Sequence, residues 1–277
     1  MPLLVAFDQY AAFLVRSAAA GLRDLVMGAH RWRLWYLIGS GEMRRRFARA
    51  RLGQFWIMLS SAISVSMMGL VWAYLWNQPV RELLPFVGVS MTVWQFLSAV
   101  LNDSTMAFPQ YSHYFLNQYM PASTIIYAVL YKNVATFFLN MIFPLAVIVF
   151  FGGAVTAYSL LSVVGLFLVI VWCVSIGYAL AILCARFRDI VQVVSSLLQV
   201  AFFVTPVLWK PEFLPPQAHY FVTYNPFAPL LAVVRDPLLG RPLSWDVWLT
   251  ACAIVLATLV CVLPFVGRFC RRLVYWL

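Results

Sequence analysis

This sequence of 277 residues lacks the groups of residues that usually mark an enzyme's active site. No glycine-rich phosphate loop of the form G-x-x-x-x-G-K-[ST] occurs, so the chain has no recognisable nucleotide site of its own. The nine acidic residues stand singly, which argues against a paired-carboxylate acid–base site. The three histidines, His30, His113 and His219, fall in separate segments. We therefore assign no catalytic residue and expect no metal site.

Paired cysteines are also absent. The five cysteines show no C-x-x-C spacing and sit in or at the ends of apolar runs; they are Cys173, Cys184, Cys252, Cys261 and Cys270. This pattern favours small packing residues over disulfides or metal ligands.

Long apolar runs fill most of the chain, in which 64% of the residues are hydrophobic and 10% are charged. A helix needs about 20 apolar residues to cross a hydrocarbon core about 30 Å thick. Six runs reach that length: Gln54–Trp76, Leu83–Ala107, Thr124–Phe151, Leu160–Ala185, Ile190–Trp209 and Trp245–Gly267. The sequence predicts an all-α membrane protein with six transmembrane helices.

The basic residues fall mainly on one side of these spans. If both termini lie in the cytoplasm, the cytoplasmic side carries Arg16, Arg23, Arg31, Arg33, Arg44, Arg45, Arg46, Arg49, Arg51, Lys132, Arg186, Arg188, Arg268, Arg271 and Arg272. The other side carries only Arg81, Lys210, Arg235 and Arg241. This asymmetry follows the positive-inside rule, so the net charge of +10 requires no nucleic-acid partner.

The N-terminal region differs from a cleavable signal peptide. Met1–Val15 is apolar but contains Asp8 and Gln9 and has no basic start. We expect residues 1–53 to form cytoplasmic and interfacial amphipathic helices, and residues 54–277 to form the six-span domain.

An arginine-rich stretch, Gly41–Trp56, leads into the first span. Its arginines surround most of a helix, so the segment is expected at headgroup level. One interpretation is anchoring to anionic lipid. The other is that Arg44, Arg45, Arg46 and Arg49 bind the phosphate of a lipid substrate, because guanidinium groups suit phosphate oxygens.

Two connections are expected on the cytoplasmic side. The link Ala185–Ile190 is short enough to force spans four and five into an antiparallel hairpin, and Asp189 is positioned to cap the second of these helices. The longer link Phe108–Ser123 is polar and aromatic, with room for a short helix. It is either a contact for a partner protein or a passive loop.

The segment Lys210–Leu243 is too apolar for an ordinary external loop and too rich in proline for a span. Non-helical backbone at membrane depth is tolerated where it is buried in protein or lines a cavity. We expect two short re-entrant helices at about Pro215–Thr223 and Pro226–Leu239, with Asn225 as N-cap and Gly240 as a stop. The alternative is an amphipathic loop lying on the surface.

Two charged residues fall inside predicted spans. Asp103 lies near the inner end of the second span and Lys132 about two turns into the third. Charges at such depth are costly and usually paired or functional. We expect a structural ion pair, with a role at the cytoplasmic entry as the alternative.

Taken in order, these stretches resemble the ABC-2 type membrane permeases that export O-antigen, capsule and teichoic acid polysaccharides. The motifs that carry the resemblance are R-L-G-Q-F-W at 51–56, R-F-R-D-I at 186–190, T-P-V-L-W at 205–209, Y-N-P-F at 224–227 and R-D-P-L-L-G at 235–240. The resemblance extends from about Trp35 to the C-terminus.

The resemblance implies a homodimer that binds two copies of a separate ABC ATPase, which holds the ATP and Mg²⁺; no cofactor is expected in this chain. In such permeases the interfacial helix and the loop after span two transmit the ATPase stroke, which implies coupling roles for Glu42, His113, Tyr114 and Asn117. The re-entrant pair closes the outer mouth, which implies an outer gate at Asn225, Pro226 and Phe227.

Aromatic residues are abundant, at 17% of the chain. Ring faces can stack on sugars while a polymer slides past them, and the resemblance implies such a lining on the first and fifth spans. The candidates are Trp72, Tyr74, Trp76, Phe202, Phe203 and Trp209. The alternative is ordinary enrichment of Trp and Tyr at membrane interfaces.

The sequence thus predicts a permease subunit, without an ATPase site, for a lipid-linked polysaccharide in the cytoplasmic (inner) membrane of a bacterium. The expected substrate is a polyprenyl-pyrophosphate-linked glycan, and membrane lipids surround the chain. One alternative is an ABC-2 exporter of a smaller amphiphile such as a drug or lipid. A membrane-embedded lipid-sugar transferase and a secondary transporter fit less well, because neither acidic clusters nor inverted repeats are evident.

Overall fold

The computed structural model describes residues 2–47, 53, 55–117, 120–153, 157–213, 215, 217, 220–242 and 244–276. Within these residues the regular structure is helical. Five helices are long and apolar enough to cross a membrane. They are α3 (Phe55–Leu75), α4 (Val80–Thr105), α7 (Ser123–Phe150), α8 (Leu161–Arg186) and α12 (Trp245–Phe269). The chain is therefore a multi-pass helical membrane protein.

The fifth predicted span is shorter than expected. Its helix α9 (Ile190–Val204) has 15 residues, which at 1.5 Å per residue gives about 22 Å, less than a hydrocarbon core of about 30 Å. The helix ends at Thr205, whose ψ of 140° is extended. Pro206 follows, and a proline disfavours the helical conformation in the residue before it. The count of six crossings remains a prediction.

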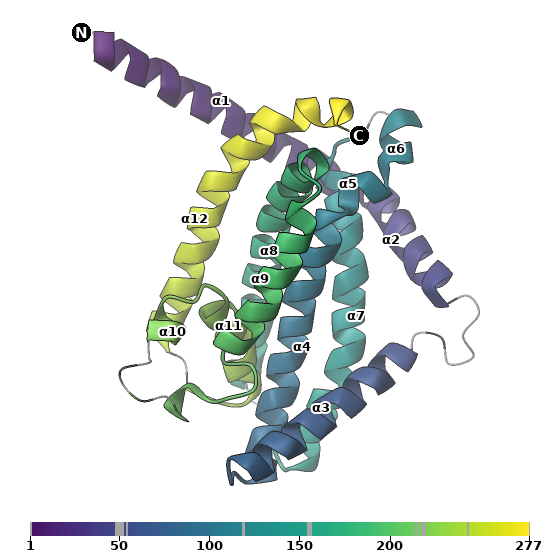
Figure 1. The fold of residues 1–277 in the computed structure, drawn as a ribbon, viewed down its shortest axis with the longest axis vertical. Helices are drawn as coiled ribbons and strands as arrows, with labels where there is room; N and C mark the ends of the chain where they lie inside the picture. The colour runs from purple at the N-terminus through teal and green to yellow at the C-terminus, as the bar shows by residue number, and fades with distance from the viewer. Residues whose placement is uncertain are drawn as a thin grey trace.

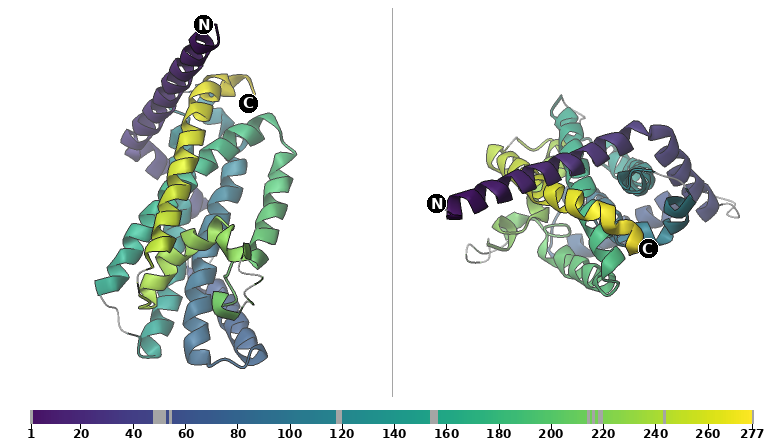
Figure 2. Two further views of the ribbon diagram at one scale, coloured as in Figure 1. Left: turned by 90° about the vertical axis from the view of Figure 1, so that its left-hand side faces the viewer. Right: turned by 90° about the horizontal axis from the view of Figure 1, so that it is seen from above.

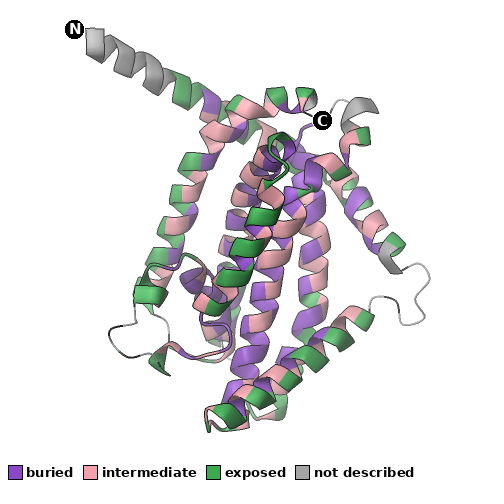
Figure 3. Ribbon diagram, viewed as in Figure 1, coloured by how far each residue is buried: buried purple, intermediate pink, exposed green. Residues whose placement is uncertain are grey.

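Helix α4 lies at the centre of the bundle and packs against α3, α7, α8, α9 and α11 (Phe227–Leu238). Figure 3 shows buried residues along nearly its whole length, whereas α3 and α12 keep much of their surface exposed. The main core joins α4 to α7, α8 and α11 through side chains such as Leu97, Val169 and Leu230, each essentially inaccessible. The exposed apolar surface of the outer helices suits contact with lipid.

The N-terminal helices lie across one end of the bundle. Figures 1 and 2 show α1 (Pro2–His30) crossing that end, followed by α2 (Trp32–Phe47). Helix α1 packs on α12 and α7, and α2 packs on α7. At the crossing of α1 and α12, a Cβ on Gly21 would strike the carbonyl of Leu263, and one on Gly267 would strike that of Ser17. Only glycine at both positions permits so close an approach.

The remaining short elements occupy both ends. Helices α5 (Ala107–Gln110) and α6 (Ser112–Asn117) lie at the same end as α1, and the 3₁₀ segment η4 (Cys270–Tyr275) follows α12 there (Figure 1). The 3₁₀ segments η1 (Ala157–Leu160) and η2 (Pro211–Phe213) precede α8 and follow α9.

The segment after α9 contains a short helix and a longer one. The predicted helix at Pro215–Thr223 appears only as α10 (Tyr220–Thr223), with residues 214, 216, 218 and 219 outside the described part of the chain. The second helix, α11, is close to the predicted range and ends before Gly240, whose φ is +68°. Its residues are mostly buried against α4, α8 and α12, so α11 does not lie on the surface.

The prediction that Asp189 caps α9 is wrong. Asp189 does occupy the N-cap position, but its side chain makes no capping hydrogen bond. Its φ of −65° and ψ of −25° are already helical, whereas a capping residue usually has an extended backbone that directs its side chain at the free N–H groups. The hairpin of α8 and α9 forms without this contact.

Candidate functional site

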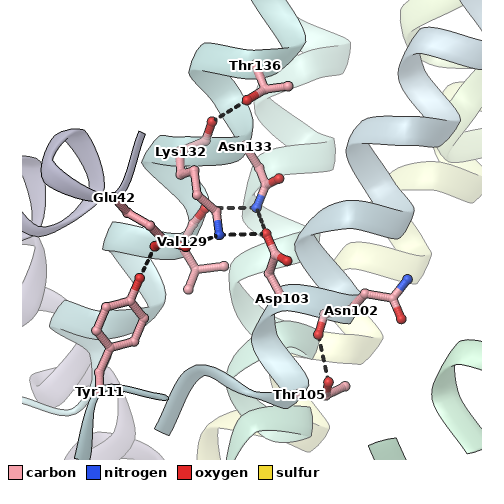
Figure 4. Close-up of polar contacts among 9 residues, drawn as sticks. All are labelled: Glu42, Asn102, Asp103, Thr105, Tyr111, Val129, Lys132, Asn133 and Thr136. Atoms are coloured by element: carbon pink, nitrogen blue, oxygen red, sulfur yellow. Dashed lines mark hydrogen bonds and ion pairs between the residues drawn. The ribbon is translucent and has the colours of Figure 1, made fainter. Parts of the chain in front are cut away.

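A polar network centred on Lys132 connects three helices at the end of the bundle that carries α1 and α2. The Lys132 ammonium of α7 lies 2.8 Å from Glu42 Oε1 of α2 and 3.0 Å from Asp103 Oδ2 of α4. The pair expected from the sequence, Asp103 with Lys132, is therefore formed. Glu42 is a further member that sequence reasoning assigned only to ATPase coupling (Figure 4).

Two neutral side chains complete this Lys132 network. The amide of Asn133 donates to Asp103 Oδ2 at 2.8 Å and to the carbonyl of Val129 at 3.0 Å. The hydroxyl of Tyr111, between α5 and α6, donates to Glu42 Oε2. Figure 4 shows Glu42 and Asp103 on either side of Lys132. Each carboxylate thus has a cation and a neutral donor, the arrangement that offsets the cost of burying charge.

The surroundings of Glu42 shift two pKa values in opposite directions. Burial alone raises the pKa of Glu42, but hydrogen bonds from Lys132 and Tyr111 and the charges of Lys132 and Arg45 lower it overall. Burial raises the pKa of Tyr111, and its hydrogen bond to the Glu42 carboxylate raises it further. Glu42 is therefore a carboxylate and Tyr111 a neutral donor at neutral pH.

The predicted coupling residues on α6 lie near this network. The rings of His113 and Tyr114 are 4.1 Å apart, and Tyr114 lies 6.2 Å from the ring of Tyr111. His113 is exposed. The side chain of Asn117 lies outside the described part of the structure. The coupling roles stay predictions.

Three of the four predicted phosphate-binding arginines, Arg44, Arg45 and Arg46, fall at the C-terminal end of α2. Arg44 and Arg45 are both exposed there. The side chain of Arg46, and the whole of Arg49, lie outside the described residues. The structure thus leaves Arg44 and Arg45 accessible to a headgroup, and their lipid contact stays a prediction.

Four of the six predicted channel aromatics gather around one apolar cluster. Trp72, Trp76, Phe202 and Trp209 pack against a core formed by Ala73, Leu83, Phe86, Val87 and Leu208. The rings of Trp72 and Trp76 are 4.5 Å apart. The Trp72 indole N–H is buried without a hydrogen-bond partner among the described residues. Four of the six predicted channel aromatics are therefore partly buried and do not form a fully exposed lining for a polymer.

The other two predicted channel aromatics project outward. Tyr74 of α3 is 79% exposed and Phe203 of α9 is 70% exposed. The carbonyl of Phe203 accepts a hydrogen bond from the Trp209 indole at 3.2 Å. These two rings are the members of the set that are free to contact a polymer, a lipid or a second copy.

The predicted outer gate connects the end of α9 to the start of α11. Asn225 Nδ2 donates to Thr205 Oγ1 at 2.8 Å, and Asn225 Oδ1 accepts from the Phe227 N–H at 2.9 Å. The Phe227 ring lies 5.3 Å from that of Trp94 on α4 and 5.6 Å from that of Trp172 on α8. Pro226 is exposed at the N-cap of α11. Asn225 and Phe227 therefore fix α11 in the bundle.

A second polar cluster, around Asp24 of α1, was missed by sequence reasoning. Asp24 Oδ2 accepts from the Ser123 N–H at 3.0 Å and from the Tyr178 hydroxyl at 2.7 Å. The Cys270 sulfur lies 3.9 Å from Asp24 Oδ1, and burial raises the pKa of this thiol to about 11. This Asp24 cluster joins α1 to the start of α7, the C-terminal half of α8 and η4. A lone acidic residue among basic ones was the available signal.

The fold and these two clusters define a multi-pass helical membrane protein whose end helices are fixed to the bundle by partly buried carboxylates. No protein-family model matches the chain. The chain is 24% identical, over 168 residues, to the O-antigen export system permease protein RfbA of Myxococcus xanthus, a match that covers 61% of this chain and 65% of that relative. It is 21% identical over 221 residues to the protein of the same name from Klebsiella pneumoniae, covering 77% of this chain and 83% of the relative. These similarities support the family that the motifs resemble, the ABC-2 type permeases of O-antigen exporters.

Proposed function

We propose that the chain is the transmembrane permease subunit of an ATP-driven exporter that moves a lipid-linked polysaccharide across the cytoplasmic membrane. The observation that carries this proposal is the similarity to two O-antigen export permeases. The relatives are named as permeases, which supports a transport subunit rather than an enzyme.

The proposed orientation places α1, α2, α5, α6 and η4 in or at the cytoplasm. These elements share one end of the bundle (Figure 1), and the charge asymmetry of the sequence supports that end as the inside. Five helices are long enough to cross the membrane, so a sixth crossing has to be made by α9 together with the segment that follows it. Both termini lie inside in this arrangement.

The proposed assembly is a homodimer with two ABC ATPase subunits below the membrane. The ATPase is expected to push on α2 and α6. The Lys132 network gives this push a route, because Glu42 joins α2 to α7 through Lys132, and Lys132 joins α7 to α4 through Asp103. A tilt of α2 is thereby expected to move the two central helices together.

The proposed substrate is a polyprenyl-pyrophosphate-linked glycan. Its phosphates are expected to meet the arginines at the C-terminal end of α2, of which Arg44 and Arg45 are exposed. The glycan is expected to slide along aromatic side chains at the interface between two copies, where Tyr74 and Phe203 project from α3 and α9.

The first test is to purify the tagged chain from its native membranes in mild detergent and identify its partners by mass spectrometry. A stoichiometric ABC ATPase is the expected result. In parallel, deletion of the gene for this chain is expected to abolish the surface glycan and leave glycan attached to lipid inside the cell. An active chain that purifies alone contradicts the proposal.

The second test separates glycan export from export of a smaller amphiphile. Tyr74→Ala combined with Phe203→Ala removes two exposed rings and is expected to reduce surface glycan several-fold at equal protein level. Phe150→Ala is the matched control, because Phe150 is 83% exposed on α7 outside the predicted channel set. Equal export by the double variant and the control argues for a path that does not use these rings.

A further inference from the structure

A cavity lies at the end of the bundle opposite α1. Its volume is about 340 Å³, within the range of small-molecule sites. Four segments that are distant in sequence form its walls: the start of α4, the end of α7, the chain after α9 and the chain after α11. The lining residues that matter here are Arg81, Glu82, Phe86, Gly152, Lys210 and Arg241. We call it the Phe86 pocket.

The basic residues of this end converge on the Phe86 pocket. The charge pattern of the sequence places only four cations on this side of the membrane, and three of them, Arg81, Lys210 and Arg241, line the pocket. The fourth, Arg235, is 2% exposed, and its guanidinium lies 4.3 Å from the centre of the Phe86 ring. The guanidinium of Arg241 lies 5.2 Å from the same ring centre. Positive charge that is sparse in the sequence is thus concentrated in space.

The carboxylates near the pocket neutralise this charge only in part. Lys210 lies 3.2 Å from Glu82, and Arg241 lies 3.5 Å from Glu212, which is itself mostly exposed. Arg235 is paired with its neighbour Asp236 at 2.8 Å. Arg81 donates to the carbonyl of Phe151 at 3.0 Å and forms no ion pair with another residue that the structure describes. The lining itself holds three cations and one carboxylate, a net charge of +2.

The walls hold these groups in place and leave room for a ligand. Lys210 is 7% exposed, so its ammonium has little freedom. Gly152 has a φ of +79°, a conformation that favours glycine, so this wall carries backbone where another residue would add a side chain. Arg241 is partly buried, and Arg81 is exposed but restrained by its hydrogen bond to the Phe151 carbonyl. Cations restrained in these ways lose less side-chain entropy on binding an anion than mobile surface lysines do.

We propose that the Phe86 pocket binds a phosphate or pyrophosphate group. Two guanidinium groups and an ammonium suit such a group, since arginine binds phosphate oxygens through two parallel N–H bonds and lysine adds a point charge. Neither the similarity to export permeases nor the predicted site residues assign this pocket. The anion is carried by a lipid headgroup or is free in solution, and the test distinguishes these sources.

This inference goes beyond the proposed function, because it concerns binding by the chain alone. Where it is combined with that function, the combination rests on the proposed orientation. The pocket then faces the compartment that receives the exported lipid phosphate. Binding is measured without the ATPase and without export, so failure of one proposal is separable from failure of the other.

The experiment uses the purified full-length chain in nanodiscs of neutral lipid, titrated with inorganic pyrophosphate by calorimetry. A second arm measures binding to nanodiscs or vesicles that contain phosphatidic acid, with zwitterionic lipid as the reference. The variants are Arg81→Gln, Arg241→Gln and Glu82→Gln. Arg188→Gln is the matched control, since it removes an exposed arginine at the other end of the bundle.

The expected result is saturable binding of one anion per chain, weakened about tenfold or more by Arg81→Gln and by Arg241→Gln. Glu82→Gln is expected to tighten binding, because it removes the carboxylate of the lining. Arg188→Gln is expected to leave binding unchanged. Binding of free pyrophosphate supports a soluble anion, and binding only to phosphatidic acid supports a headgroup. No binding in either arm overturns the proposal, as does equal weakening by Arg81→Gln and Arg188→Gln.

Discussion

The two ends of this molecule use charge in opposite ways. In the Lys132 network one cation meets two carboxylates, and each carboxylate also accepts from a neutral donor. The lining of the Phe86 pocket holds three cations and one carboxylate, that of Glu82, which pairs with Lys210 alone. The first arrangement joins helices and leaves little unsatisfied. The second leaves charge directed at a cavity. Only 10% of the residues in this sequence are charged. Cations matched by nearby carboxylates join helices, whereas cations that outnumber the nearby carboxylates are available to a ligand.

The largest expected effect comes from breaking the Lys132 network. Lys132→Ala leaves Glu42 and Asp103 facing each other without a cation. Removal of one partner from a fully buried ion pair costs about 3–5 kcal/mol, and we expect about 2–3 kcal/mol here because the Asp103 side chain is 36% exposed. The measurement is equilibrium unfolding in mixed detergent micelles. Lys132→Arg is the control that keeps the charge. If the free energy of unfolding of Lys132→Ala falls by less than about 1 kcal/mol, the network does not hold α2, α4 and α7 together.

A charge swap tests whether Glu42 is a full member of the network. Asp103→Lys combined with Lys132→Asp restores a simple pair, but it places a second carboxylate beside Glu42. We therefore expect the swap to remain destabilised by about 1–3 kcal/mol, and addition of Glu42→Gln to recover most of that loss. Full recovery by the swap alone would reduce the network to the pair of Asp103 and Lys132. The same unfolding assay decides.

The Asp24 cluster offers a third matched set. Asp24→Asn replaces a charged acceptor of two hydrogen bonds by a neutral amide, and we expect a loss of about 1–2 kcal/mol together with faster proteolysis within α1. Asp246→Asn is the matched control, because Asp246 is exposed at the start of α12. Identical behaviour of the two variants would mean that Asp24 does not hold α1.

The lowered pKa of Glu42 predicts a smaller effect that depends on pH. A carboxyl whose pKa is lower in the folded than in the unfolded state stabilises the fold above its ordinary value of 4.5, and this contribution is lost as the pH falls through the folded value. As the pH falls from about 5 to about 3, the wild type should therefore lose more stability than Glu42→Gln, by less than about 1 kcal/mol. Parallel pH profiles for the two proteins would contradict this prediction.

The smallest effect is expected in the Phe86 pocket. Arg81 is exposed and has no carboxylate partner among the described residues, so Arg81→Gln should change stability by no more than about 0.5 kcal/mol. The same unfolding assay, without added anion, measures this change. A loss comparable to that of Lys132→Ala would remove the distinction between the two ends.

The long helices were predictable because their signal is local. The apolar runs of α3, α4, α7, α8 and α12 match the observed helices to within three residues at each end. The pair of Asp103 and Lys132 was also predictable, since isolated charges in apolar runs need partners. The short α9 was less so, because hydropathy continues through Pro206 to Trp209 while the helix stops at Val204.

The contacts between distant segments were not predictable. Glu42 looked like one acid in an arginine-rich stretch, and only the packing of α2 on α7 brings it to Lys132, 90 residues away. Asp24 and Tyr178 are 154 residues apart and meet because α1 crosses the bundle. The Phe86 pocket likewise needs four segments to converge. Periodicity and spacing report what one segment does, whereas these sites depend on how segments are arranged.

The crossing of α1 over α12 is a close contact between two helix backbones. Where Gly21 and Gly267 meet, backbone touches backbone, and along the same crossing the Arg268 guanidinium of α12 lies 5.6 Å from the Phe13 ring of α1. Three residues farther along α1, Asp24 accepts hydrogen bonds from Ser123 of α7 and Tyr178 of α8. The close backbone contact at Gly21 and the hydrogen bonds of Asp24 thus lie at separate positions on the same helix. Loss of the Asp24 hydrogen bonds would free α1 from α7 and α8 at this point, while the contact of Gly21 with α12 would still hold α1 on the bundle.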